Sequence, residues 1–180
     1  METIREYRGA YIVAAVFGIL VALPFCTSAL ANPAPKIHDV QVKGSGTDLL
    51  NSAVVHSKKT TPTGEIQRST EIVELRGDLN GKILYHVTTV IDTKNGTLVN
   101  SGDQVFSGTI AGSEPVMLHD SRFRFKVNFA SGAETGSVYL FDHIAGPRVR
   151  CELKVNGTGK NAAGNPTFAY TGTCKFGSGK

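Results

Sequence analysis

The chain has 180 residues and a formal net charge of +4, a size that fits one domain behind an N-terminal leader. Its basic residues are spread along strand-like segments, which argues against a nucleic-acid-binding surface. The sequence also lacks a serine nucleophile motif, metal ligands at short spacing and a nucleotide-binding loop. We therefore expect no metal and no other cofactor.

Residues 1–31 have the pattern of a secretory signal peptide. A polar start with Arg5 and Arg8 is followed by an apolar run over 9–25 and by Ala29-Leu30-Ala31. A retained anchor is the alternative, although Pro24 interrupts the end of a run that is short for a membrane span. Cys26 follows the bulky Phe25, which argues against lipidation. The pattern predicts a secreted or periplasmic protein with no stable membrane anchor after cleavage.

The remaining chain divides into a flexible leader over 32–37, one domain over 38–176 and a disordered tail over 177–180. Its domain contains short β-like runs separated by Gly, Asn, Asp and Pro. Tight turns are expected at 78–81 and 94–97, where Asn-Gly supplies positive φ angles. The candidate strands are 39–43 (weak), 49–56, 65–76, 82–92, 98–110, 122–130, 137–144, 148–155 and 167–176. This spacing predicts an all-β, antiparallel barrel of about eight strands, with a β-sandwich as the alternative.

Alternation of apolar and polar residues predicts the inner face of several strands. Phe123, Phe125, Val127 and Phe129 form one inner set, and polar or basic residues alternate with them. The run over 137–144 is different, because it is apolar on both faces. We expect a terminal segment or a second subunit to cover its outer face, so a homo-oligomer is one possibility.

Two cysteines remain after residue 31, and an exported domain with two cysteines usually pairs them. Cys151 and Cys174 both belong to inner sets of the last two strands. If they are opposite each other, Leu153 faces Gly172 and Val155 faces Tyr170, so pairing and hydrophobic pattern agree. We predict a disulfide between them; two buried thiols are the alternative, because bridges between adjacent strands are geometrically demanding.

The C-terminal third resembles a known family. Lys-Val-Asn-Gly-Thr-Gly-Lys at 154–160, Ala-Gly at 163–164 and the strand at 168–173 resemble the last hairpin of dirigent proteins and allene oxide cyclases, and 99–108 resembles their glycine-punctuated central strand. The resemblance covers about residues 70–176 and implies an eight-stranded calycin-like barrel. Lys160 and Asn161 stand where the family has an aromatic residue, and no catalytic acid can be transferred to a position of this chain.

An eight-stranded barrel can hold one small ligand, and polar groups among apolar ones would mark its site. The inward phase selects Glu71, Tyr85, Tyr139 and His143 as candidate ligand-binding residues. An inward Glu71 could act as a general acid or base.

Three functions remain open. The leading hypothesis is an exported module that binds a small, largely apolar molecule inside the barrel. The second is a cyclase or dirigent-like enzyme that guides a reactive intermediate in a shaped cavity. The third is a structural or interaction protein with a filled core.

Overall fold

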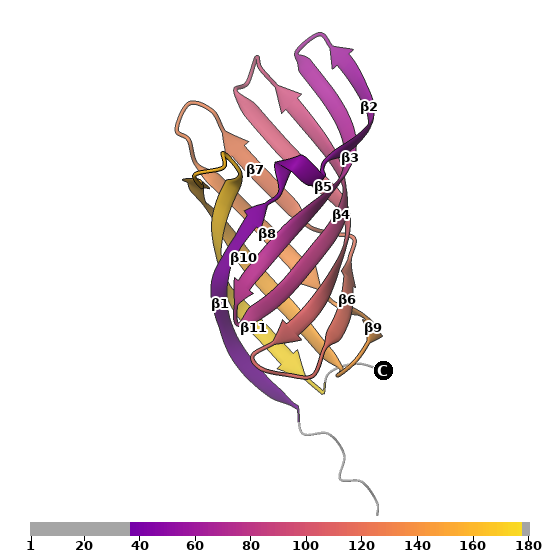
Figure 1. Ribbon diagram of the computed structural model, residues 1–180. Coiled ribbons are helices and arrows are strands. Elements are labelled where there is room, and N and C mark those ends of the chain that lie inside the picture. The colour runs from indigo at the N-terminus through magenta and orange to yellow at the C-terminus, as the bar shows by residue number, and fades with distance from the viewer. Residues whose placement is uncertain (1–36, 178–180) are drawn as a thin grey trace, which may run out of the picture. The chain divides into compact units, whose positions relative to one another are not determined.

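The computed structural model describes residues 37–177, which form eleven β-strands and one short 3₁₀ turn (Figure 1). The strands are β1 (His38–Asp48), β2 (Val54–Thr61), β3 (Gly64–Gly77), β4 (Leu79–Asp92), β5 (Thr97–Ile110), β6 (Val116–Asp120), β7 (Arg124–Asn128), β8 (Glu134–Leu140), β9 (Asp142–Ala145), β10 (Val149–Lys160) and β11 (Pro166–Phe176), and the turn is η1 (Leu50–Ser52). No α-helix occurs in this part of the chain. None of its helical segments has the length and apolar character that a membrane span requires. The predicted signal peptide and most of the predicted leader and tail lie outside the described residues.

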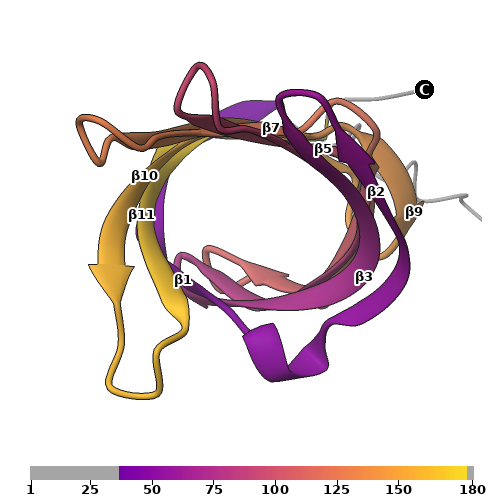
Figure 2. The same cartoon turned by 90° about the horizontal axis from the view of Figure 1, so that it is seen from above.

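Eight of the strands close into an antiparallel barrel (Figure 2). The ring runs β3–β1–β11–β10–β8–β7–β5–β4 and returns to β3. Closure depends on the pairing of the first and last strands, which extends from His38↔Phe176 to Thr47↔Thr167. The predicted barrel is therefore confirmed, and the sandwich alternative is wrong.

The other three strands share edges with strands of the ring. β2 follows β1 along the same edge of β3, after the interruption at η1. β6 and β7 likewise share one edge of β5, and β9 pairs with β6. The candidate strand at 137–144 is in fact two strands, β8 and β9, which separate at Phe141.

Three points of the sequence prediction need correction here. The turn expected over 78–81 lies one step earlier: Gly77 has a φ of 106°, and β4 already begins at Leu79. The weak run at 39–43 belongs to an eleven-residue strand that closes the barrel, and β6 was not predicted at all. The turn before β5 is where it was expected, with Gly96 at a φ of 60°.

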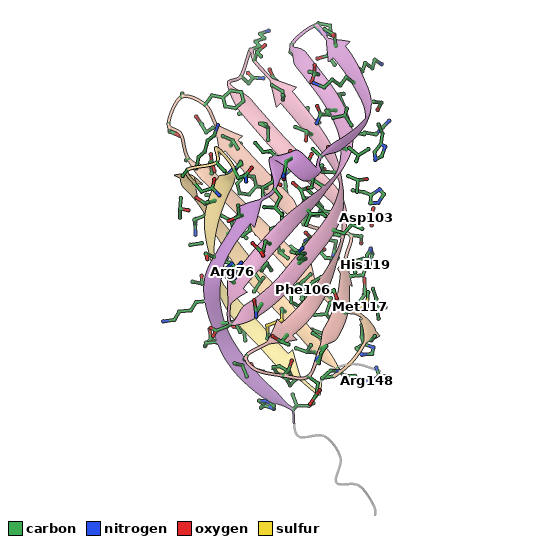
Figure 3. All side chains as sticks on the ribbon, viewed as in Figure 1. Arg76, Asp103, Phe106, Met117, His119 and Arg148 are labelled. Carbon is green, nitrogen blue, oxygen red and sulfur yellow. A yellow bond between two sulfur atoms is a disulfide. The ribbon has the colours of Figure 1, made fainter. Side chains whose placement is uncertain are left out.

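One end of the barrel is filled by apolar side chains. Leu79, Phe106, Ile110, Leu118 and Leu140 have no exposed surface and pack in one cluster. Figure 3 shows Phe106 inside the barrel. Burying such side chains contributes about 1.5–3 kcal/mol each to the free energy of unfolding.

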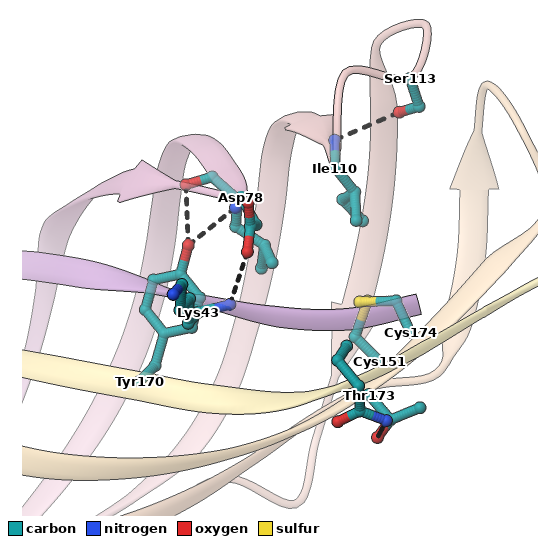
Figure 4. The surroundings of a disulfide bond; sticks show 10 residues. Lys43, Asp78, Ile110, Ser113, Cys151, Tyr170, Thr173 and Cys174 are labelled. Atoms are coloured by element: carbon teal, nitrogen blue, oxygen red, sulfur yellow. Dashed lines mark hydrogen bonds between the residues drawn. A yellow bond between two sulfur atoms is a disulfide. The ribbon is translucent and has the colours of Figure 1, made fainter. Parts of the chain in front are cut away.

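The predicted cysteine pair lies in this filled end (Figure 4). Cys151 is directly opposite Cys174, and their Sγ atoms lie 1.97 Å apart, at disulfide-bonding distance. The predicted register is also confirmed, because Leu153 pairs with Gly172 and Val155 pairs with Tyr170.

The outer face of β8 is covered by arginine side chains of the same chain. The Arg122 guanidinium lies 5.3 Å from the ring centroid of Tyr139 and 4.8 Å from that of Phe141, and Arg150 stacks on Phe141 from 4.7 Å. Such contacts combine cation–π attraction with burial of the aliphatic stems. A terminal segment or second subunit is therefore not needed to explain the apolar residues there.

Candidate functional site

A cavity of about 300 Å³ occupies the half of the barrel opposite the disulfide. It extends from the filled end toward η1 and the β10–β11 hairpin. Its walls are mostly apolar, with Leu50, Val73, Ile83, Phe123, Phe125 and Val155 among the lining residues. The barrel therefore offers an apolar site that is open to solvent on one side and has the size that suits one small organic molecule.

A row of polar side chains crosses the inner wall at the boundary between the filled end and the cavity. Glu71 of β3, Tyr85 of β4, Gln104 of β5 and Asp120 of β6 are successive cross-strand partners. All four are buried, with 8%, 6%, 5% and 1% of their surface exposed. We call this row the polar belt. Buried polar groups are tolerated only when they are hydrogen-bonded, so the contacts of the belt decide what it can do.

One half of the polar belt joins a carboxylate from β1. The Tyr85 hydroxyl lies 2.9 Å from Glu71 Oε2 and 3.1 Å from Asp48 Oδ2, and its single proton can be donated to either. The other oxygen of Glu71 accepts a hydrogen bond from the Ser69 hydroxyl. Asp48 Oδ1 is buried and has no hydrogen-bond partner. The cavity wall thus holds two carboxyl groups around one phenol, and the two hydroxyl donors leave two of the four carboxyl oxygens without a hydrogen bond.

Burial shifts the titration of this cluster. Desolvation, with the neighbouring Glu71 carboxylate as the second cause, raises the pKa of Asp48 from 3.8 to about 6. Desolvation and the same two carboxylates raise the pKa of Tyr85 above its ordinary value, so the phenol stays protonated and remains a donor. Asp48 therefore changes its charge close to neutral pH, inside an apolar cavity. A group with this property can serve as a proton donor or acceptor.

The other half of the polar belt is structural. Asp120 accepts hydrogen bonds from Gln104 Nε2 at 2.9 Å, from the Arg122 backbone N–H at 2.6 Å and from the Tyr139 backbone N–H at 2.7 Å. It thereby holds the interruption between β6 and β7 against β8. Asp120 does not line the cavity, whereas Gln104 does.

Two of the four predicted ligand-binding residues line the cavity, Glu71 and Tyr85. The inward positions predicted for Tyr139 and His143 are wrong. The inward phase of β8 contains Val138 and Leu140, so Tyr139 faces outward. His143 is exposed on β9, where its Nε2 lies 2.8 Å from the Gly146 carbonyl oxygen. Because the segment is apolar on both faces, alternation alone could not select the inner one.

Sequence reasoning missed Asp48, Asn100 and Gln104, which all line the cavity. Asn100 and Gln104 share the inward phase of β5 with Leu98 and Phe106, so the alternation of that strand could have identified them. Asp48 had no such signal, because it ends a strand that contains almost no apolar residues.

A second group of ionisable side chains lies on the outer wall. His119 Nε2 lies 3.3 Å from an Asp103 oxygen, and its Nδ1 lies 3.4 Å from an Asp142 oxygen (Figure 3). Both aspartates are exposed, so these pairs are screened by water. Within residues 37–177, no group of His, Cys, Asp and Glu side chains is arranged to hold a metal ion.

Comparison of the chain with models of known protein families, with curated proteins and with solved structures found no match. The resemblance to allene oxide cyclases and dirigent proteins accordingly stays a prediction. What the protein does must be inferred from the cavity and its lining.

Proposed function

We propose that the protein binds a small, largely apolar molecule in the barrel cavity. The observation that supports this function is the cavity of about 300 Å³ itself, which has apolar walls and a polar cluster of Asp48, Glu71 and Tyr85 at one side. Apolar walls supply affinity through desolvation, and a few polar groups orient the ligand. A protein with only a structural role would have no use for a cavity of this size, since unfilled volume lowers stability.

The expected affinity is modest to moderate. Burying about 200 Å² of apolar ligand surface contributes roughly 5 kcal/mol at 25 cal/mol per Å². Association costs several kcal/mol in lost translational and rotational freedom, so hydrogen bonds to the polar cluster must supply part of the net affinity. Dissociation constants of about 0.1–1 mM, about 4–5.5 kcal/mol, are therefore expected.

A second candidate function is catalysis in the same cavity, by an enzyme of the cyclase or dirigent-like kind. Asp48, with its pKa raised to about 6, is the observation that favours it. Such a carboxyl group can donate or accept a proton near neutral pH, while the Tyr85 hydroxyl donates a hydrogen bond beside it. Enzymes that shape a reactive intermediate need few groups beyond these, because orientation lowers much of the barrier.

The cellular compartment belongs to the same proposal. A cysteine pair at bonding distance fits an oxidising compartment, such as the periplasm or the extracellular space. This supports the export predicted from the first 31 residues.

Binding can be tested with Nile red, a neutral dye whose fluorescence rises in apolar surroundings. We expect the wild-type protein to enhance its emission with saturation at one dye per chain. Val138→Phe places a ring into the cavity and should weaken dye binding by about tenfold or more, equal to about 1.4 kcal/mol. Thr135→Phe adds the same ring to the exposed outer face of β8 and is the matched control.

Equal dye binding by both variants would show that the dye sits elsewhere and would contradict the proposed site. Native mass spectrometry of the protein purified from its own compartment supplies an independent measurement. We expect a copurifying small molecule that is lost in the Val138→Phe variant. Release of a chemically altered product, abolished by Asp48→Asn, would instead favour the enzyme.

A further inference from the structure

The cavity has a one-sided charge pattern. Three acidic residues line it, Asp48, Glu71 and Glu134. Arg124 is the basic residue that borders it within the described chain, but Arg124 is exposed and lies on the opposite phase of β7 from the inward Phe125. The interior is therefore acidic, although the whole chain carries a net charge of +4.

The hydrogen-bonding pattern of the cavity is one-sided as well. Within residues 37–177, two buried side-chain atoms lack a hydrogen-bond partner, Asp48 Oδ1 and Asn100 Oδ1. Both are acceptor oxygens, and both residues line the cavity. A buried acceptor without a donor is costly, so a molecule in the cavity gains most by supplying donors there.

The side-chain hydrogen-bond donors near Asp48 already donate to other groups of the protein. The Tyr85 hydroxyl donates to Glu71 or Asp48, and the Ser69 hydroxyl donates to Glu71. Gln104 Nε2 donates to Asp120. At the filled end of the cavity, the Tyr170 hydroxyl faces the backbone carbonyl oxygens of Arg76 and Leu79. A ligand that accepts hydrogen bonds at this row would have to break one of these bonds, whereas the Thr89 hydroxyl and the Asn100 amide line the cavity four residues farther along β4 and β5.

From these two patterns we infer that the cavity selects ligands that donate hydrogen bonds and carry no negative charge, and that its preferred ligand is an apolar molecule with one amine group, bound as the ammonium ion at Asp48. The inference rests on the proposed binding function and names its ligand class. A rotation of the Asp48 side chain turns the buried Oδ1 toward the cavity, where an ammonium group offers it N–H donors and pairs its charge with the carboxylates of Asp48 and Glu71.

The same geometry rejects the carboxylate of a fatty acid or similar molecule. Such a group would enter an apolar cavity beside Asp48 and Glu71 with no cationic side chain directed at it, and like charges at short distance in a desolvated site repel strongly. The affinity for an alcohol should lie between those for the amine and the carboxylate, because a hydroxyl can donate a hydrogen bond to Asp48 Oδ1 but brings no charge.

The test uses three ligands with one skeleton: 2-naphthylmethylamine, 2-naphthylmethanol and 2-naphthoate. Each competes with Nile red for the mature protein at pH 8, where Asp48 is ionised. Because a charge-assisted hydrogen bond is stronger than a neutral one, we expect the amine to bind about tenfold more tightly than the alcohol. The carboxylate should bind about tenfold more weakly than the alcohol, or not measurably.

Asp48→Asn tests the assigned partner. It keeps the size of the side chain and removes its charge, so the amine should lose most of its advantage while the affinity for the alcohol changes less than about threefold. Asp103→Asn removes an exposed aspartate from the outer wall and should change nothing. If Asp48→Asn does not fold, as judged by its thermal transition, Glu71→Gln removes the neighbouring charge and should also reduce the preference for the amine.

The outcomes separate the two proposals. Failure of Nile red and all three ligands to bind would overturn the proposed binding function. Binding of the alcohol together with equal or tighter binding of the carboxylate would overturn the ligand class and leave the binding function intact. An amine preference that survives both Asp48→Asn and Glu71→Gln would also overturn the assignment to this cluster.

Discussion

Tyr170 and Gly44 are cross-strand partners on β11 and β1, and the Tyr170 ring occupies the space that a side chain at position 44 would fill. The Tyr170 hydroxyl accepts a hydrogen bond from the Leu79 N–H at 2.7 Å and lies 3.2 Å from the Arg76 carbonyl oxygen (Figure 4). Tyr170 thus reaches across β1 to the turn between β3 and β4. Because β1 pairs with β11 to close the barrel, this contact stabilises the closure.

We predict that Gly44→Ala destabilises the protein by about 2 kcal/mol or more, the range for overpacking of a buried site. The added Cβ would overlap both the Tyr170 hydroxyl and the Arg76 carbonyl oxygen, which is backbone and cannot move aside easily. Urea denaturation measures the change. Ser45→Ala, on the neighbouring position of the opposite phase, is the control and should stay within about 0.5 kcal/mol. A Gly44→Ala variant as stable as the wild type would mean that the Tyr170 ring does not occupy this space.

Glycines at inward positions of β1 explain why the sequence predicts only a short strand there. Gly44 lies opposite Tyr170, and Gly46 makes room for the ring of Phe168. A strand whose inward positions are glycines, filled by rings from its neighbour, shows no apolar alternation. By contrast, β3 and β5 carry their own inward apolar residues and could be located from the sequence. β6 was missed because it is short and ends in the buried acid Asp120.

For the candidate site, prediction succeeded where one face of a strand was plainly polar. Glu71 shares its phase with Val73 and Leu75, so its inward direction followed from alternation. The direction of Tyr139 could not be predicted in this way, because its strand carries apolar residues on both faces. The outer face is covered by Arg122. Asp48 joins the site only through the pairing of β1 with β3, which places Asp48 opposite Val73. Such a long-range contact leaves no trace in the local pattern.

The disulfide between Cys151 and Cys174 should be present in the mature protein as isolated. Thiol titration of the unfolded, unreduced chain should find no free thiol. Replacing both cysteines with alanine should lower the free energy of unfolding by about 2–4 kcal/mol, because the bridge restricts the unfolded chain. Nile red binding should persist, since neither cysteine lines the cavity. Two free thiols per chain would refute the bridge.

Asp120→Asn should be strongly destabilising although the two side chains have nearly the same shape. Asp120 accepts three hydrogen bonds, and two of the donors are backbone N–H groups. An amide would turn its NH₂ group toward one of these donors and leave a buried donor unpaired, which costs about 1–3 kcal/mol. Asp142→Asn, at an exposed aspartate, should have little effect. Equal thermal transitions for the two variants would contradict the structural role of Asp120.

The last prediction concerns pH. The pKa of Asp48 is about 6 in the folded protein against 3.8 for the ordinary carboxyl group. Between these values the folded chain binds the proton and the unfolded chain does not, so the contribution of Asp48 to stability grows as the pH falls from about 7 to about 4. At pH 8 the buried, ionised Asp48 opposes folding.

Asp48→Asn imitates the protonated acid at every pH. We therefore expect this variant to be more stable than the wild type at pH 8 by about 1–3 kcal/mol, and the difference to shrink toward zero near pH 4. Urea denaturation of both proteins at pH 4, 6 and 8 measures this difference in the free energy of unfolding. Carboxyl groups with a lowered pKa, such as Asp92, are present in both proteins, so their contributions cancel in the difference. Asp103→Asn, at an exposed position, should differ little from the wild type in free energy of unfolding, and this difference should not grow from pH 4 to pH 8. A pH-independent difference for Asp48→Asn would mean that Asp48 is not desolvated in the folded protein, and the acceptor assigned to the ligand amine would then lie in water.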